Sequence, residues 1–64
     1  MTSRELLRHL RRLGARIVTD RGKGGHVMVE WNGRVTYVPT GSGELRTGTL
    51  QAILKALAIP PDRL

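Results

Sequence analysis

The 64-residue sequence contains no cysteine, and this absence excludes several classes of protein. Disulfide frameworks, thiol nucleophiles and thiolate zinc sites all depend on cysteine. Two histidines and five scattered carboxylates are also a poor supply of metal ligands, so we expect no dedicated metal site. Any chemistry carried out by this chain is therefore expected to need no metal and no other cofactor.

Long hydrophobic runs are missing as well. Residues 1–5 contain no apolar signal segment, and no stretch of the chain reaches membrane-spanning length. We therefore expect a cytoplasmic protein that does not contact a membrane. At this length, residues 1–64 are expected to form a single small domain, whose core is only marginally stable because no disulfide reinforces it.

Aromatic residues and negative charges are both scarce. Trp31 and Tyr37 are the only aromatic side chains apart from histidine, and we expect them to pack locally on a hairpin rather than to stack on bases. The net charge is +6, and most of the basic residues are arginines. Because guanidinium groups suit bidentate contact with phosphate, nucleic acid is the first partner that this charge suggests. A well-hydrated basic surface without a partner is the alternative.

Hydrophobic periodicity predicts two helices. Thr2 and Glu5 have the spacing of a capping box, and leucines follow at helical intervals until Gly14, which favours the end of a helix. A second helix is expected to begin near Thr47 and to stop at Pro60-Pro61. The residues expected to face the core are Leu6, Leu7, Leu10 and Leu13 in the first helix and Leu50, Ile53, Leu54 and Leu57 in the second.

Three strands are expected between the helices, at residues 15–20, 26–31 and 34–38. The last two are joined by Asn32-Gly33, the dipeptide that most favours a type I′ hairpin turn. A three-stranded antiparallel sheet needs a cover on one face, and two amphipathic helices can supply it. The sequence therefore predicts an α+β domain with two layers in the order α-β-β-β-α.

A basic glycine loop at residues 21–25 leads directly into His26. Its glycines allow close approach to phosphate, its cations can hold that phosphate, and histidine transfers protons near neutral pH. RNA supplies its own nucleophile, the 2′-hydroxyl, so its cleavage needs proton transfer, charge neutralisation and in-line geometry. His26 is therefore the candidate catalytic residue. The candidate RNA-binding residues are Arg21, Lys23, Gly24 and Gly25 in the loop and Arg8, Arg11 and Arg12 in the first helix.

Simpler interpretations stand beside these. The arginines of the first helix can form a solvated face, and the loop glycines can serve only to turn the chain. The other histidine, His9, is interpreted as a polar group on a solvated helix face.

Several ordered motifs resemble one known family. They are Lys23-Gly24-Gly25-His26, then Val38-Pro39, then Gly43-Glu44-Leu45-Arg46-Thr47-Gly48-Thr49-Leu50 and Ile53-Leu54. Together they resemble the HicA (YcfA-like) mRNA interferase toxins of bacterial and archaeal toxin–antitoxin modules, and the resemblance extends from the first helix to Ile59. The chain departs from the family at Gly25, where serine is common, and at Gly41, near a position where many relatives carry a second histidine.

The resemblance implies a fold similar to a double-stranded-RNA-binding domain, endoribonuclease activity towards mRNA, and inhibition by a HicB-like antitoxin. It also assigns the family's catalytic histidine to His26. A non-catalytic RNA-binding module and a small protein-interaction domain remain as alternatives.

Periodicity alone does not decide which face of the sheet the helices cover. His26, Met28 and Glu30 point one way and the intervening valines point the other, and both rows contain apolar groups. Domains of the implied fold bind RNA on their helical side. We therefore expect Met28 in the core beneath the helices and His26 at its margin.

Overall fold

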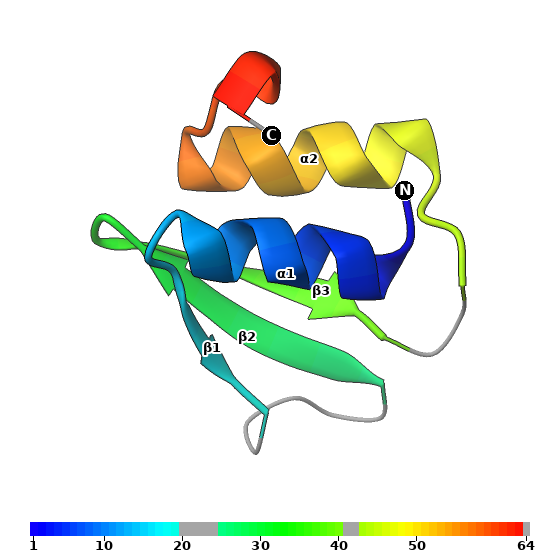
Figure 1. The fold of residues 1–64 in the computed structure, drawn as a ribbon, viewed down its shortest axis with the longest axis horizontal. Helices are drawn as coiled ribbons and strands as arrows, with labels where there is room; N and C mark the ends of the chain where they lie inside the picture. The colour runs from blue at the N-terminus through cyan, green and yellow to red at the C-terminus, as the bar shows by residue number, and fades with distance from the viewer. Residues whose placement is uncertain (20–24, 41–42, 64) are drawn as a thin grey trace.

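The computed structural model describes residues 1–19, 25–40 and 43–63 and shows a three-stranded sheet with two helices on one side (Figure 1). The strands are antiparallel in the order β1-β2-β3, and the two helices run in the same direction. This arrangement confirms the expected α+β fold. The elements are α1 (Ser3–Arg12), β1 (Arg16–Val18), β2 (His26–Trp31), β3 (Arg34–Pro39), α2 (Thr47–Leu57) and a final 3₁₀ turn, η1 (Pro61–Arg63), which the sequence did not predict.

The hairpin between β2 and β3 forms as predicted. Asn32 and Gly33 both have positive φ angles, 52° and 79°, which the type I′ turn requires. The turn fixes the register from Trp31 opposite Arg34 to His26 opposite Pro39. On the other side of β2, the strand β1 pairs over three residues only and is shorter than the expected strand at residues 15–20.

Both helices end in the same backbone motif. After α1, the amide of Ala15 donates to the carbonyl of Leu10, and after α2 the amide of Ile59 donates to the carbonyl of Leu54, both at 2.9 Å. This is the Schellman pattern, which needs a residue with positive φ just beyond the helix. Gly14 supplies it after α1, as expected, whereas Ala58 supplies it after α2. The second helix therefore ends at Leu57, before the proline pair that was expected to stop it.

A short backbone ladder joins the N-terminal segment to the segment that precedes α2. The amide of Leu45 donates to the carbonyl of Met1 at 2.9 Å, and the amide of Ser3 donates to the carbonyl of Gly43 at 3.3 Å. The carboxylate of Glu44 also contacts the Met1 amine, and this hydrogen bond is the main reason that the pKa of the amine is raised. The ladder holds the first turns of the two helices near each other.

The core lies between the helices and one face of the sheet. In α1 the capping box of Thr2 and Glu5 is present, with the Glu5 amide 3.1 Å from the Thr2 hydroxyl. Ala15, Leu45 and Ile59 were not among the residues expected to face the core. The full set of buried apolar side chains is Leu6, Leu10, Ala15, Val27, Val29, Val38, Leu45, Ile53, Leu54, Leu57 and Ile59.

The sheet presents to the helices the face opposite to the one we expected. Val27 and Val29 are buried beneath the helices, whereas Met28 is only half-buried and His26 is exposed. The expectations that Met28 enters the core and that His26 lies at its margin are therefore both wrong. The physical reason lies in Glu30, which shares the row of Met28: burial of that row would desolvate a carboxylate, whereas the opposite row is apolar throughout.

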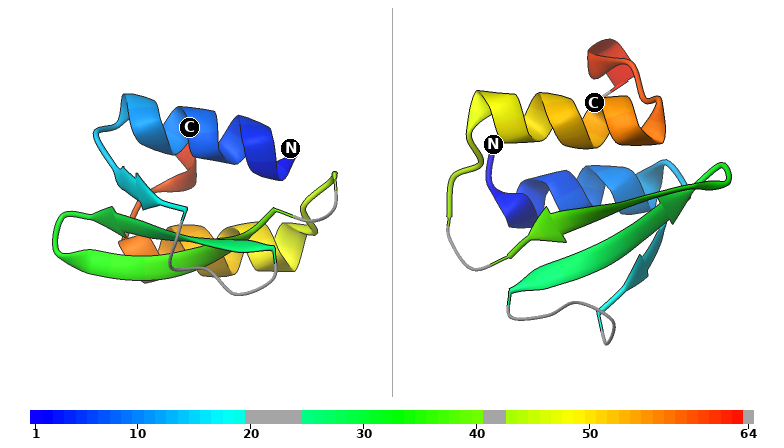
Figure 2. Two further views of the ribbon diagram at one scale, coloured as in Figure 1. Left: turned by 90° about the horizontal axis from the view of Figure 1, so that it is seen from below. Right: turned by 180° about the vertical axis from the view of Figure 1, so that it is seen from behind.

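The other face of the sheet, which we call the open face, is not covered by either helix. The left view of Figure 2 looks at the molecule from below, with α2 behind the strands. Val35 and Tyr37 are 47% and 52% exposed on this face, and Arg16 lies 3.9 Å from the Glu30 carboxylate. The open face thus combines apolar side chains with an ion pair, and His26 lies at one end of it.

Candidate active site

His26 stands at the start of the central strand and is accessible to solvent. Its strand partner is Pro39, and one step beyond this pair the amide of Thr40 donates to the carbonyl of Gly25. This hydrogen bond ties the residue before the histidine to the end of β3. Gly25 has a φ of 89°, in the left-handed region where a side chain is strained, so a glycine suits this position. The start of β2 is therefore held firmly although the imidazole itself is exposed.

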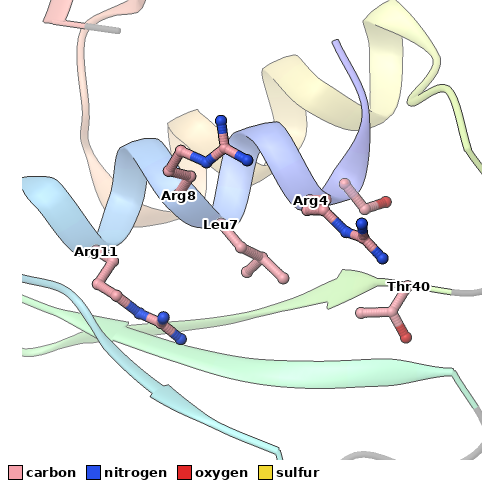
Figure 3. A pocket seen from close by; sticks show the side chains of 6 residues that line it. Arg4, Leu7, Arg8, Arg11 and Thr40 are labelled. Carbon is pink, nitrogen blue, oxygen red and sulfur yellow. The ribbon is translucent and has the colours of Figure 1, made fainter.

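A groove of about 380 Å³ lies beside this end of the sheet (Figure 3). Arg4, Leu7, Arg8 and Arg11 recur at intervals of three and four residues, so the 3.6-residue helical repeat places them on one side of α1. Figure 3 shows Arg4 and Arg11 extending from α1 towards the strands, with Thr40 near Arg4. The six lining residues are Ser3, Arg4, Leu7, Arg8, Arg11 and Thr40.

The groove and His26 are connected through Thr40. Thr40 forms part of the groove lining, and its amide is bonded to the carbonyl of Gly25, the immediate neighbour of His26. The alternation of the strand, however, turns the His26 side chain towards the open face, away from the helices. A ligand that occupies the groove must therefore pass over the end of the sheet to reach the imidazole.

The structure brings some of the predicted binding residues together and leaves others apart. Arg8 and Arg11 line the groove, whereas Arg12 is exposed on α1 and is not part of the lining. Arg4 also lines the groove, although it was not among the predicted binding residues. Its signal was available in the sequence, since Arg4, Arg8 and Arg11 share one helical side. Arg21, Lys23 and Gly24 fall outside the described residues, so their predicted roles remain predictions.

The electrostatics of the groove are dominated by guanidinium groups. Within residues 1–19, 25–40 and 43–63, the two ion pairs are Met1 with Glu44 and Arg16 with Glu30, and neither involves the groove arginines. Glu5 is occupied in the capping box, where hydrogen bonds from Thr2 are the main cause that lowers the pKa of its carboxyl. The charge of Arg8 contributes more weakly to the same lowering of the Glu5 pKa, but no carboxylate of the described chain forms an ion pair with the groove arginines.

Two other kinds of site are not found in the part of the chain that the structure describes. There, no three histidine, aspartate or glutamate side chains come together in a way that could hold a metal ion. No helix within those same residues has the length and apolar character needed to cross a bilayer.

Comparison with known proteins gives one informative result. No curated protein matches the chain. The family model for the HicA toxin of bacterial toxin–antitoxin systems, however, matches residues 3–59, from the first residue of α1 to the buried Ile59 that follows α2. This match spans both helices and all three strands, including the strand start that carries His26 and the helix that lines the groove. The chain therefore belongs to the HicA toxin family.

Proposed function

We propose that this toxin is an endoribonuclease that cleaves RNA without a metal ion, with His26 transferring a proton at the ribose or at the leaving oxygen. The observation that carries the proposal is the placement of His26, which presents an exposed imidazole at the start of β2. The residue before it, Gly25, accepts a hydrogen bond from the amide of Thr40, and Thr40 lines the arginine-rich groove. An exposed histidine of this kind can serve as a general acid or base near neutral pH.

The chemistry divides between the histidine and the basic residues. The 2′-hydroxyl of RNA attacks the adjacent phosphorus, and the 5′-oxygen of the next nucleotide leaves. His26 takes the proton from the attacking hydroxyl or gives one to the leaving oxygen, so that this oxygen does not carry a full negative charge. Water makes the other proton transfer, and the products are a 2′,3′-cyclic phosphate end and a 5′-hydroxyl end. Positive charge beside the reacting phosphate stabilises the negative charge that develops on its oxygens. We assign this second role to the basic loop residues Arg21 and Lys23, with the backbone of Gly24 and Gly25 close to the phosphate.

The test compares the two histidines of the chain. RNA cleavage is measured with purified protein in the presence of a chelator, for the parent, His26→Ala and His9→Ala. We expect His26→Ala to cut about 10² to 10⁴ times more slowly, as is usual when a general acid or base is lost. His9→Ala, which changes a half-buried histidine on α1, is the matched control and should retain cleavage.

The outcomes of this test distinguish a nuclease from an RNA-binding module. A His26→Ala protein that cuts as fast as the parent contradicts the proposed mechanism. A parent protein that binds RNA but never cuts it indicates instead a non-catalytic RNA-binding module.

Membership of this family also implies an antitoxin partner. We propose that the partner is a HicB-like acidic protein that covers His26 and residues 21–25. The exposed apolar side chains of the open face, Val35 and Tyr37, offer contact area on the same face as the imidazole. An acidic partner is attracted to a chain of net charge +6, and burial of apolar groups then slows dissociation.

Hydrogen exchange on the co-purified complex tests this inhibition. We expect protection at the start of β2 and in the preceding loop. Neutralisation of the toxin without protection at these positions means that the antitoxin acts from a distant site.

A further inference from the structure

A buried hydroxyl in the groove has no hydrogen-bond partner among residues 1–19, 25–40 and 43–63. Ser3 is only 5% exposed, and its Oγ forms no hydrogen bond with any group in the described residues. Leaving such a group unsatisfied destabilises the folded state, so native proteins rarely retain one without a reason. Ser3 belongs to the groove lining, so a ligand that enters the groove and displaces the side chains over this enclosed hydroxyl can supply the missing acceptor.

The surroundings of this hydroxyl favour an anion as that acceptor. Arg4 and Arg8 lie on the same side of α1, and neither forms an ion pair with a carboxylate within the described chain. Ser3 is also the first residue of α1, and the N-terminal end of a helix carries partial positive charge that attracts anions. Guanidinium groups, a hydroxyl donor and a helix start are together well suited to a tetrahedral phosphate.

We propose that the end of the groove formed by Ser3, Arg4 and Thr40 binds one phosphate of the RNA backbone, and that Arg8 and Arg11 contact the adjoining backbone. This inference rests on the proposed function in that it names RNA as the source of the phosphate. The phosphate held here is not the one that is cleaved, because His26 faces the open side of the sheet while the groove lies on the helical side. The groove residues therefore position the substrate.

The first experiment uses inorganic phosphate as the probe, so that its result does not depend on any RNA cleavage. Binding is followed by the phosphate-induced rise in Tm of the parent, Arg4→Gln and Arg34→Gln. Arg34→Gln is the matched control: it removes the same charge from an exposed residue at the hairpin end of the sheet, opposite the end that carries His26. We expect Arg4→Gln to weaken phosphate binding by roughly tenfold and Arg34→Gln to leave it unchanged. Equal weakening in both variants means that net charge, and not the groove, attracts the phosphate, and overturns the proposal.

Ser3→Ala tests the hydroxyl directly. Without phosphate, this variant should be at least as stable as the parent, because an unsatisfied buried hydroxyl is removed. With saturating phosphate, its rise in Tm should be smaller than that of the parent, because one donor to the phosphate is lost. If Ser3→Ala is instead less stable without phosphate and gains the full rise in Tm, the hydroxyl has a partner within the protein and the inference is wrong.

The RNA experiment identifies the source of the phosphate. In steady-state cleavage, Arg4→Gln should raise KM several-fold with little change in kcat, which is the behaviour of a positioning contact. The affinity of the non-cleaving His26→Ala background for RNA should also fall, with the salt dependence flattened by about one phosphate contact. Because this binding measurement needs no catalysis, it remains informative if the proposed nuclease activity fails. Phosphate binding in the groove with unchanged RNA affinity in Arg4→Gln means that the site takes free phosphate, and contradicts the proposal.

Discussion

The two helices cover the same face of one sheet, but they are stabilised in different ways. α1 has a complete capping box at its start and a glycine just beyond its end. α2 has no side-chain hydrogen bond at its N-cap, Arg46, and its final turn is followed by an alanine in the left-handed conformation. The number of buried apolar side chains differs in the opposite direction. α2 buries Ile53, Leu54 and Leu57, whereas α1 buries only two leucines, Leu6 and Leu10.

The way in which α1 is stabilised leaves its arginines available for binding. Caps act through the backbone and the terminal residues, so they leave the side chains in the middle of a helix free. Four arginine side chains of α1 take no part in its caps, and three of them line the groove. α2 holds its place by burying apolar area, and a single lysine lies within its span. The chain thus stabilises its charged helix at the ends and its apolar helix along its length.

The largest expected effect comes from removing apolar packing in α2. Leu57 is fully buried, and Leu57→Ala should lower the free energy of unfolding by about 2–5 kcal/mol, because it leaves a cavity in the core. In so small a domain this loss unfolds a large fraction of the molecules. Urea unfolding followed by circular dichroism measures the effect. The exposed neighbour Lys55→Ala is the control, and a similar loss in both variants contradicts the packing role assigned to α2.

A smaller effect is expected from exchanging the residues that end the helices. Ala58→Gly should raise the free energy of unfolding by about 1 kcal/mol, because alanine is strained at a φ of 58° and glycine is not. Gly14→Ala should lower it by a similar amount, since Gly14 has a φ of 98°. A Cβ on Gly14 meets no atom within 4 Å, so any loss there reports backbone strain rather than a steric clash. Thermal unfolding of both variants, with opposite shifts in Tm, is the expected result. Shifts of the same sign in both variants contradict it.

A still smaller effect is expected at the charged start of α1. Arg4 is a cation in the first turn, where the helix dipole disfavours positive charge, so Arg4→Gln should raise the free energy of unfolding by about 0.3–0.5 kcal/mol. The gain should shrink in high salt. Chemical unfolding at two salt concentrations measures it. A loss of stability instead means that Arg4 makes a structural contact, and its role in a ligand site is then secondary.

The smallest expected effect is the acid sensitivity of the capping box. The pKa of Glu5 is lowered in the folded protein, chiefly by hydrogen bonds from Thr2. Its contribution to stability is therefore complete above the ordinary carboxyl pKa of 4.5 and is lost as the pH falls through the lowered pKa. The stability difference between the parent and Glu5→Gln should disappear over this range. A difference that grows on acidification contradicts the linkage.

Much of the fold could be predicted because short-range signals determine it. The capping box of Thr2 and Glu5, the Asn32-Gly33 turn and the leucine periodicity each specify local structure, and the structure confirms all three. The facing of the sheet could not be settled by periodicity, since both rows of β2 contain apolar residues. The charge of Glu30 in the row of Met28 was the signal that favours the observed facing. The N-terminal ladder to Leu45 depends on pairing across more than forty residues of sequence, and no local sequence pattern predicts it.

The candidate site was predicted in part. His26 was identified because a histidine after a glycine loop is a local pattern, but its catalytic role remains a prediction. The groove was not foreseen, because it depends on how α1 lies beside Thr40, and that arrangement is a product of tertiary packing. Only this placement makes Arg4 and Ser3 candidate ligand-binding residues.

Trp31 makes a structural hydrogen bond and also gives the protein a fluorescence signal that comes from one site. Its indole nitrogen donates to the carbonyl of Leu13, just beyond α1, at 3.2 Å, and it is the single tryptophan of the chain. All tryptophan fluorescence therefore originates at the junction between the hairpin and the charged helix. A shift of the emission to longer wavelength, seen before the helical circular dichroism signal is lost, reports that α1 has separated from the sheet. Opening of this junction can thus be followed in solution without attaching a dye.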